Sequence, residues 1–312
     1  MTTKQQHEIL FAVMARPTKP VSEDYDFVVE QVPVFMRHNG EFVRTGDYAN
    51  QRMDTGARVG ITSEKYGIIQ NGDLLNMVKN TFGTMDLGDY KEQSFVCDEG
   101  KRFYGQFDFP QQVQAPVVGD DVSLRLTVRN SYDKTCRASV SVGMMRLVCA
   151  NGMTSMRKAA SLSCRHSSTV SIASIRDGIE DAVSMFDDSV KDLTVMAGKD
   201  ISHDQGVLIL NNLAQKKVLS ESLKDSIELV WNDPTHSEDS DRSVYNLYNA
   251  CTQHLTHVGQ SRFEYSSKRS DAVLNSLFRV AKDEKFFGRM LLPVDKKSAA
   301  KVDIAAQHIS LN

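Results

Sequence analysis

The chain has 312 residues, of which 41% are hydrophobic and 25% are charged, and its formal net charge is −3. This length is enough for one large domain or two smaller ones, and the charge excludes a protein that wraps nucleic acid as a polycation over its whole surface. We find no signal peptide and no membrane span, and the five cysteines contain no CxxC pair, so we expect reduced thiols. The composition therefore favours a cytoplasmic protein without a membrane partner.

The first third of the chain is expected to be rich in strands. Short apolar runs punctuated by glycines occupy residues 1–60, and 48–71 predicts a strand, an Asp-Thr-Gly turn, a second strand and a third extended piece. Apolar residues at helical spacing predict a helix from Leu74 to Phe82, with Asp73 as its cap. Further strands are expected at 94–97 and 102–109.

The most regular pattern of the chain is a β-hairpin over 122–149. Apolar and polar residues alternate from Val122 to Arg129, and a second alternating run extends from Arg137 to Cys149. The alternation slips at Gly143, which predicts a β-bulge there. Such a bulge would turn Arg146 to the same side as Arg137 and give the hairpin a cationic outer face.

Basic residues are concentrated around this hairpin, and only Asp133 offsets them between Leu124 and His166. Cations can pair with phosphates, and an aromatic ring at the hairpin tip can stack on a base. The alternative is that the arginines only solvate an exposed sheet face. The candidate nucleic-acid-binding residues are Arg125, Arg129, Tyr132, Lys134, Arg137, Arg146, Arg157, Lys158 and Arg165.

The second half of the chain is expected to be helical. A long helix is predicted from Ser171 to Gly198, followed by helices at 205–218, 220–231, 242–258 and 271–286. The fold class is therefore α+β, with a β-rich N-terminal half carrying an antiparallel hairpin sheet and an all-helical C-terminal half. We divide the chain into a β-rich region (1–166), a helical region (167–295) and a flexible tail (296–312).

Signatures of catalysis are not found in this sequence. There is no P-loop, no GxGxxG after a strand and no GxSxG elbow. His254 and His257 share a helix face but have no third ligand at matching spacing, and Cys164 and His166 would alternate on a strand. We therefore expect neither a metal nor a cofactor, and a non-enzymatic protein is favoured, although a hydrolase assembled from scattered residues stays open.

Several spaced motifs resemble one known family. The order RMDTGARVGITSEKYGIIQN (52–71), RNSYDKT (129–135), MRLVCANGM (145–153), SCRHSS (163–168), WNDP (231–234) and YNACT (248–252) is similar to the phage/plasmid-like protein family, a domain of unknown function (932). The resemblance spans about Tyr48 to Thr256. It implies a protein of a phage, prophage or plasmid in the cytoplasm of a bacterial host, and it implies no particular chemistry. A hairpin sheet followed by helices is also similar, at the level of fold, to single-strand annealing recombinases of the Rad fifty-two-like group.

Together these observations favour a nucleic-acid-binding protein of a mobile element. We expect it to bind or anneal single-stranded DNA in recombination or replication, and to form a homo-oligomer. The alternative is a protein-interaction or counter-defence module whose partner is a host or phage protein. A salt series of oligonucleotide binding and a pull-down with and without nuclease would separate the two.

Overall fold

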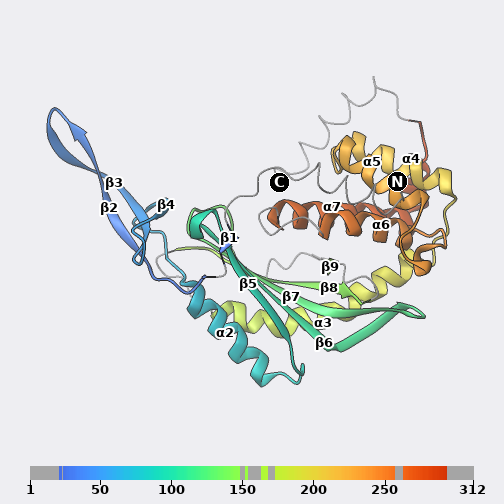
Figure 1. Ribbon diagram of the computed structural model, residues 1–312, viewed down its shortest axis with the longest axis horizontal. Coiled ribbons are helices and arrows are strands. Elements are labelled where there is room, and N and C mark those ends of the chain that lie inside the picture. Colours follow the sequence, from blue (N-terminus) through green and yellow to red (C-terminus); the bar gives the residue numbers. More distant parts are fainter. Residues whose placement is uncertain are drawn as a thin grey trace, which may run out of the picture.

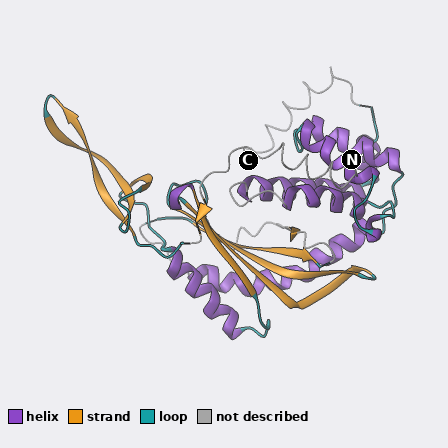
Figure 2. Cartoon of the chain, viewed as in Figure 1, coloured by secondary structure: helices purple, strands orange, loops and turns teal. Residues whose placement is uncertain are grey.

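A computed structural model describes residues 21–22, 24–147, 152–153, 163–167, 173–256 and 263–293. It consists of a curved antiparallel sheet, a protruding β-arm and a group of C-terminal helices (Figure 1). Strands dominate the first half of the described chain and helices the second, as Figure 2 shows. The predicted α+β class is confirmed.

The main sheet has seven described strands in the order β1-β5-β6-β7-β8-β10, with β9 paired to β8. All neighbours are antiparallel. The strands are β1 (Val21–Ser22), β5 (Lys91–Cys97), β6 (Arg102–Val117), β7 (Asp120–Ser131), β8 (Ala138–Arg146), β9 (Gly152–Met153) and β10 (Ser163–Cys164). A short 3₁₀ turn, η1 (Asp98–Gly100), joins β5 to β6.

One face of this sheet is apolar and carries the main core. Cross-strand register aligns Phe107 with Leu126 and Leu126 with Val142, and such rows repeat along the strands. Helices α2 (Asn71–Thr84) and α3 (Ala173–Ala197) lie along the sheet in Figure 1, and their buried apolar residues join the same core. Burial of this shared face is the main stabilising contribution to the N-terminal half.

The β-arm is a separate sheet of three strands, β2 (Val29–His38), β3 (Glu41–Arg52) and β4 (Arg58–Ser63). Asn39 and Gly40 both have positive φ, 51° and 89°, as a two-residue I′ hairpin turn requires. β4 pairs only with the proximal part of β3, from Asp47 to Gln51. The distal part of the arm is therefore a two-stranded ribbon that projects away from the body (Figure 1).

The C-terminal helices pack on one another beyond α3. They are α4 (His203–Gln215), α5 (Glu221–Asn232), α6 (Val244–Thr256), α7 (Phe263–Lys282) and α8 (Glu284–Met290), with a 3₁₀ turn η3 (Ser237–Asp239) before α6. α3 contacts both α6 and α7, so it connects the sheet to the helical group. Trp231 and Tyr248 are completely or almost completely buried in this group.

Three local predictions are wrong. β8 pairs with β7 without interruption from Arg129↔Ser139 to Val122↔Arg146, so there is no bulge at Gly143. The helix predicted at 271–286 is divided, because Asp283 caps the new helix α8 by accepting a hydrogen bond from the Phe286 N–H. Helix α2 begins after Gln70, without a side-chain cap from Asp73. The predicted tail at 296–312 lies outside the described residues.

Candidate nucleic-acid interface

The segment Asn130-Ser131-Tyr132 joins the β-arm to the main sheet. The Asn50 side chain of β3 donates a hydrogen bond to the Tyr132 carbonyl oxygen at 2.6 Å, and the Tyr132 hydroxyl accepts one from the Asn71 N–H at 3.1 Å. Gly60 of β4 lies so close that an added Cβ would be 2.1 Å from the same carbonyl oxygen. The arm therefore rests directly on this backbone, which only a glycine permits at that position.

The same segment also receives the chain between β4 and α2. The Tyr66 hydroxyl donates to the Ser131 carbonyl oxygen at 2.7 Å, and the Asn130 side chain donates to the Ile69 carbonyl oxygen at 2.8 Å. Asn50, Asn130 and Tyr132 are completely buried. Because buried polar groups are stable only when they are hydrogen-bonded, these contacts fix the base of the arm in one arrangement.

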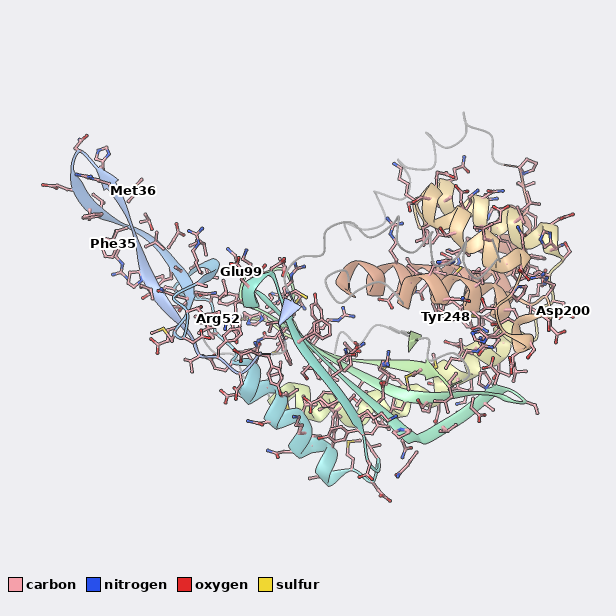
Figure 3. All side chains as sticks on the ribbon, in the orientation of Figure 1. Phe35, Met36, Arg52, Glu99, Asp200 and Tyr248 are labelled. Carbon is pink, nitrogen blue, oxygen red and sulfur yellow. The ribbon has the colours of Figure 1, made fainter. Side chains whose placement is uncertain are left out.

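Arg52 forms a second attachment at the base of the arm (Figure 3). Its guanidinium pairs with Asp54 at 2.6 Å, donates to the Glu99 carbonyl oxygen at 3.3 Å and lies 3.7 Å from the centre of the Phe27 ring. The hydrogen bond with Asp54 raises the pKa of Arg52. Arg52 is thus committed to structure, and its charge is not available to a ligand.

His166 packs against the base of the arm from a third segment. Its ring stacks on Tyr66 with centroids 4.8 Å apart, and its Nδ1 lies 3.1 Å from the Gly67 carbonyl oxygen. The Nε2 atom is buried and has no hydrogen-bond partner among the described residues. Burial lowers the pKa of His166, because a proton on Nε2 would add a buried charge without an acceptor.

These contacts gather five exposed basic residues from three stretches of chain. Four of them lie within two residues of a contact described above: Arg58 precedes Gly60, Lys65 precedes Tyr66, Lys134 follows Tyr132 and Arg165 precedes His166. The fifth, Arg137, follows Cys136, whose N–H donates to the Ser131 hydroxyl at 3.1 Å. We call Arg58, Lys65, Lys134, Arg137 and Arg165 the junction cations; all five side chains are exposed.

The junction cations are not neutralised by the described part of the chain. None of them forms an ion pair with a carboxylate there, although Asp133 and Glu64 lie nearby in sequence. Asp133 accepts hydrogen bonds from Thr135, and Glu64 accepts one from the Tyr48 hydroxyl at 3.3 Å. Exposed cations at this density can bind a polyanion with displacement of its counterions.

Two of the predicted binding residues are completely buried, so these predictions are corrected. Tyr132 is 0% exposed and belongs to the anchor of the arm, so its ring cannot stack on a base. Arg146 is also 0% exposed and lies on the apolar side of the sheet, opposite to the predicted side, because no bulge shifts β8. It pairs with Asp120 at 2.6 Å and with Asp239 at 2.8 Å.

Arg146 thus links the sheet to the C-terminal helices. Burial by itself would lower the pKa of this guanidinium, but the hydrogen bonds that it donates to Asp120 and Asp239 outweigh burial and raise it. Asp239 belongs to η3, the 3₁₀ turn before α6, which lies 93 residues after Arg146 in sequence. One cation is therefore shared by two carboxylates, one on the sheet and one in the turn before α6.

Arg125 and Arg129 share a face of β7, as predicted, but that face is not an open cationic surface. The Arg125 guanidinium forms a two-pronged pair with Asp108 of β6, and both side chains are about 15% exposed. Arg129 is 8% exposed and lies beside Tyr104 in the register. The hairpin itself is confirmed, and its polar face is mostly buried.

The remaining predicted residues divide into two groups. Lys134, Arg137 and Arg165 are exposed and belong to the junction cations. Arg157 and Lys158 lie outside the described residues, as does His257.

Residues considered for catalysis do not form a site in the described chain. Burial raises the pKa of the Cys164 thiol, so it is a poor nucleophile. Within the described ranges no group of three or more His, Cys, Asp or Glu residues could hold a metal ion. Nor does any described helix combine the length and apolar character that crossing a membrane requires.

Sequence reasoning missed the arm and two of the junction cations. Asn39-Gly40 between two runs of apolar residues is a strong hairpin signal that would have placed the arm. Nothing local indicates that Arg58 and Lys65 approach the loop around Lys134, because hydrogen bonds between residues 65 to 82 positions apart bring them there.

Comparisons with known proteins support the predicted family. The chain matches the family described as Domain of unknown function (DUF932) over residues 58–278. No curated protein and no solved structure matches the chain significantly. The matched region begins at β4 and ends in α7, so it contains the junction cations and all strands of the main sheet except β1, but not the distal arm. Since the match covers more than half of the sequence, the chain belongs to the DUF932 family.

Proposed function

We propose that this protein binds single-stranded nucleic acid through the junction cations, without catalysis, in the recombination or replication of a mobile element. The observation that supports the proposal most directly is the gathering of five exposed, unneutralised cations at the base of the β-arm in a chain of net charge −3. A local patch of this kind attracts phosphates even when the whole molecule is weakly acidic.

Binding at this junction would depend on the phosphate backbone. Long flexible cations displace condensed counterions from the strand and contribute little sequence preference. The loop that carries Lys134 and Arg137 is held by Ser131, whose hydroxyl accepts from the Cys136 N–H and donates to the Cys136 carbonyl oxygen. This loop would therefore present its charges from a defined position beside the arm.

The test is a salt series of binding to a labelled oligothymidylate by wild-type protein and by the double variant Arg137→Ala/Arg165→Ala. The variant should bind more weakly, and the slope of log affinity against log salt should fall by about 1.4, at about 0.7 per lost phosphate contact. Its urea midpoint should not change, because exposed charges contribute little to stability.

A matched control removes two exposed cations from the opposite end of the molecule. Lys282→Ala/Lys285→Ala changes the net charge equally, and both residues are exposed at the end of α7 and in α8. Equal slopes for the two double variants would refute the junction as the binding site. Absence of oligonucleotide binding, together with a protein partner that survives nuclease, would favour the interaction-module alternative.

A further inference from the structure

The distal arm exposes apolar side chains on both faces. Phe35 is 54% exposed, Phe42 77%, Met36 54% and Val43 45%, and Figure 3 shows Phe35 and Met36 on the projecting ribbon. Single exposed apolar residues are ordinary on a protein surface, but here each face of a two-stranded ribbon carries a pair of them. A two-stranded ribbon buries little apolar surface by itself, so these side chains contribute little to the stability of the arm.

Register separates these residues into two unlike faces. Phe35 pairs with Arg44, and Arg37 pairs with Phe42, so these four side chains share one face. We call them the ring face. Met36 pairs with Val43 on the opposite face, where His38 also pairs with Glu41. The ring face therefore combines two phenyl rings with two guanidiniums and includes no carboxylate among its four members.

The geometry of the ring face suits stacked nucleobases. The rings occupy diagonal positions, which in an antiparallel pair lie about 7–8 Å apart, and each phenylalanine has an arginine as its cross-strand partner. Aromatic rings flanked by cations bind successive bases of a single strand, because every base has a π-face and every nucleotide a phosphate. Bases inside a duplex are already stacked on one another and do not offer that face.

The charge of the ring face disfavours a second copy of this chain as its occupant. In a two-fold interface the same face meets itself, so the four guanidiniums of two ring faces would be brought together without a carboxylate from either ring face. Like charges placed opposite each other in a sheet contact are destabilising. A polyanion has the complementary charge.

The ring face also continues toward the junction. A bulge opposite Val34 consists of Gly46, whose φ is 87°, and its two neighbours. Beyond the bulge, the Tyr48 side chain lies on the same face of β3 as Arg44. The Arg44 guanidinium lies 5.3 Å from the centre of the Tyr48 ring and donates to its hydroxyl. One face of β3 thus connects the distal rings with Asn50, which contacts Tyr132 at the junction.

We infer that the ring face is a base-stacking surface for unpaired nucleotides of a strand whose phosphates are held at the junction. This inference rests on the proposed function and deepens it: the junction would supply salt-dependent affinity, and the ring face would supply the preference for unpaired bases. The two contributions are separable, because an abasic strand keeps its phosphates and lacks the bases.

The experiment compares the affinity of the protein for an oligothymidylate of about 15 nucleotides with its affinity for an abasic strand of equal length. This length is near the upper limit of known single-strand binding sites, which cover about 4–16 nucleotides. Wild-type protein should prefer the strand with bases. Phe35→Ala/Phe42→Ala should lose this preference, by at least about 5-fold per ring, which is the low end of about 1–3 kcal/mol per stacked base. Its affinity for the abasic strand should match that of wild-type protein.

The matched control is Met36→Ala/Val43→Ala, which removes the exposed apolar pair of the opposite face and should keep the preference. A second readout uses Phe35→Trp, since the natural Trp231 is 1% exposed and insensitive to ligand at the arm. Its added fluorescence should be quenched by the strand with bases and not by the abasic strand.

Three results would overturn the inference. The first is an unchanged preference for the strand with bases in Phe35→Ala/Phe42→Ala, and the second is the lack of that preference in wild-type protein. The third is a variant that keeps the preference but no longer forms oligomers, which would assign the ring face to contacts between copies. A fourth result would separate the two proposals. If removal of junction cations left binding to the abasic strand unchanged while base-dependent binding persisted, the junction would be refuted as the phosphate site and the ring face would stay supported.

Discussion

Gly60→Ala should detach the β-arm from the sheet. An added Cβ would lie 2.1 Å from the Tyr132 carbonyl oxygen and 3.1 Å from the Asp133 Cα, whereas real Cβ contacts essentially never fall under 3.0 Å. The backbone must therefore move by about 1 Å, and backbone cannot rotate away as a side chain can. Overpacking of this kind costs about 1–3 kcal/mol.

The same displacement lengthens the 2.6 Å bond from the Asn50 side chain to that carbonyl oxygen. Asn50 is completely buried, so a lost partner costs about 1–3 kcal/mol more, and the two costs overlap because one movement causes both. We expect the free energy of unfolding to fall by about 2–4 kcal/mol. Native-state hydrogen exchange should accelerate first at the amides of β4.

Urea unfolding measures the change, and Gly83→Ala provides the control. Gly83 lies in α2, where no atom is within 4 Å of an added Cβ, so the substitution should leave stability unchanged or raise it by about 0.5–1 kcal/mol. If Gly60→Ala unfolds at the wild-type midpoint with unchanged exchange in β4, the arm does not rest on the Tyr132 backbone as described.

Two further predictions concern Arg146 and His166. Arg146→Met should lower the free energy of unfolding by about 3–5 kcal/mol, because Asp120 and Asp239 would remain as uncompensated carboxylates. The control Arg137→Met, at an exposed position, should change the free energy of unfolding by less than about 0.5 kcal/mol. Equal urea midpoints for the two variants would contradict the buried network. Because burial lowers the pKa of His166, the unfolded chain binds the proton first as the pH falls below about 6.5, so wild-type protein should lose more stability between pH 7 and pH 5 than His166→Gln. Parallel curves of urea midpoint against pH for the two proteins would show that His166 titrates normally.

The sequence alone predicted those elements whose signal is local. The alternation from Val122 to Arg129 placed β7 and its apolar face correctly, and helical spacing placed α2 and α3. The slip at Gly143 was misread because Met144 and Met145 are both apolar. Met144 points to the core and Met145 to the other face, so the regular register continues through them.

What covers the second face of a strand is not a local property. Alternation showed that Arg125 and Arg146 are cations on a hairpin, but it could not show that their partners are Asp108 on the neighbouring strand and Asp239 in a distant 3₁₀ turn. A buried arginine and an exposed one have the same local sequence pattern. The candidate site was therefore found in part, with Lys134, Arg137 and Arg165, and its other members required the fold.

The base of the arm is specified more strictly than stability alone requires. Asn50, Asn130 and Tyr132 bury hydrogen-bonded polar groups, although apolar residues of similar volume can stabilise a core at least as well. Hydrogen bonds add a defined orientation, because each bond forms only when its donor and acceptor are correctly placed. The element that this base directs is the distal ribbon, with exposed rings and guanidiniums and almost no core of its own. The proposed base stacking at the ring face requires such a fixed direction, because the rings must keep their place relative to the junction cations.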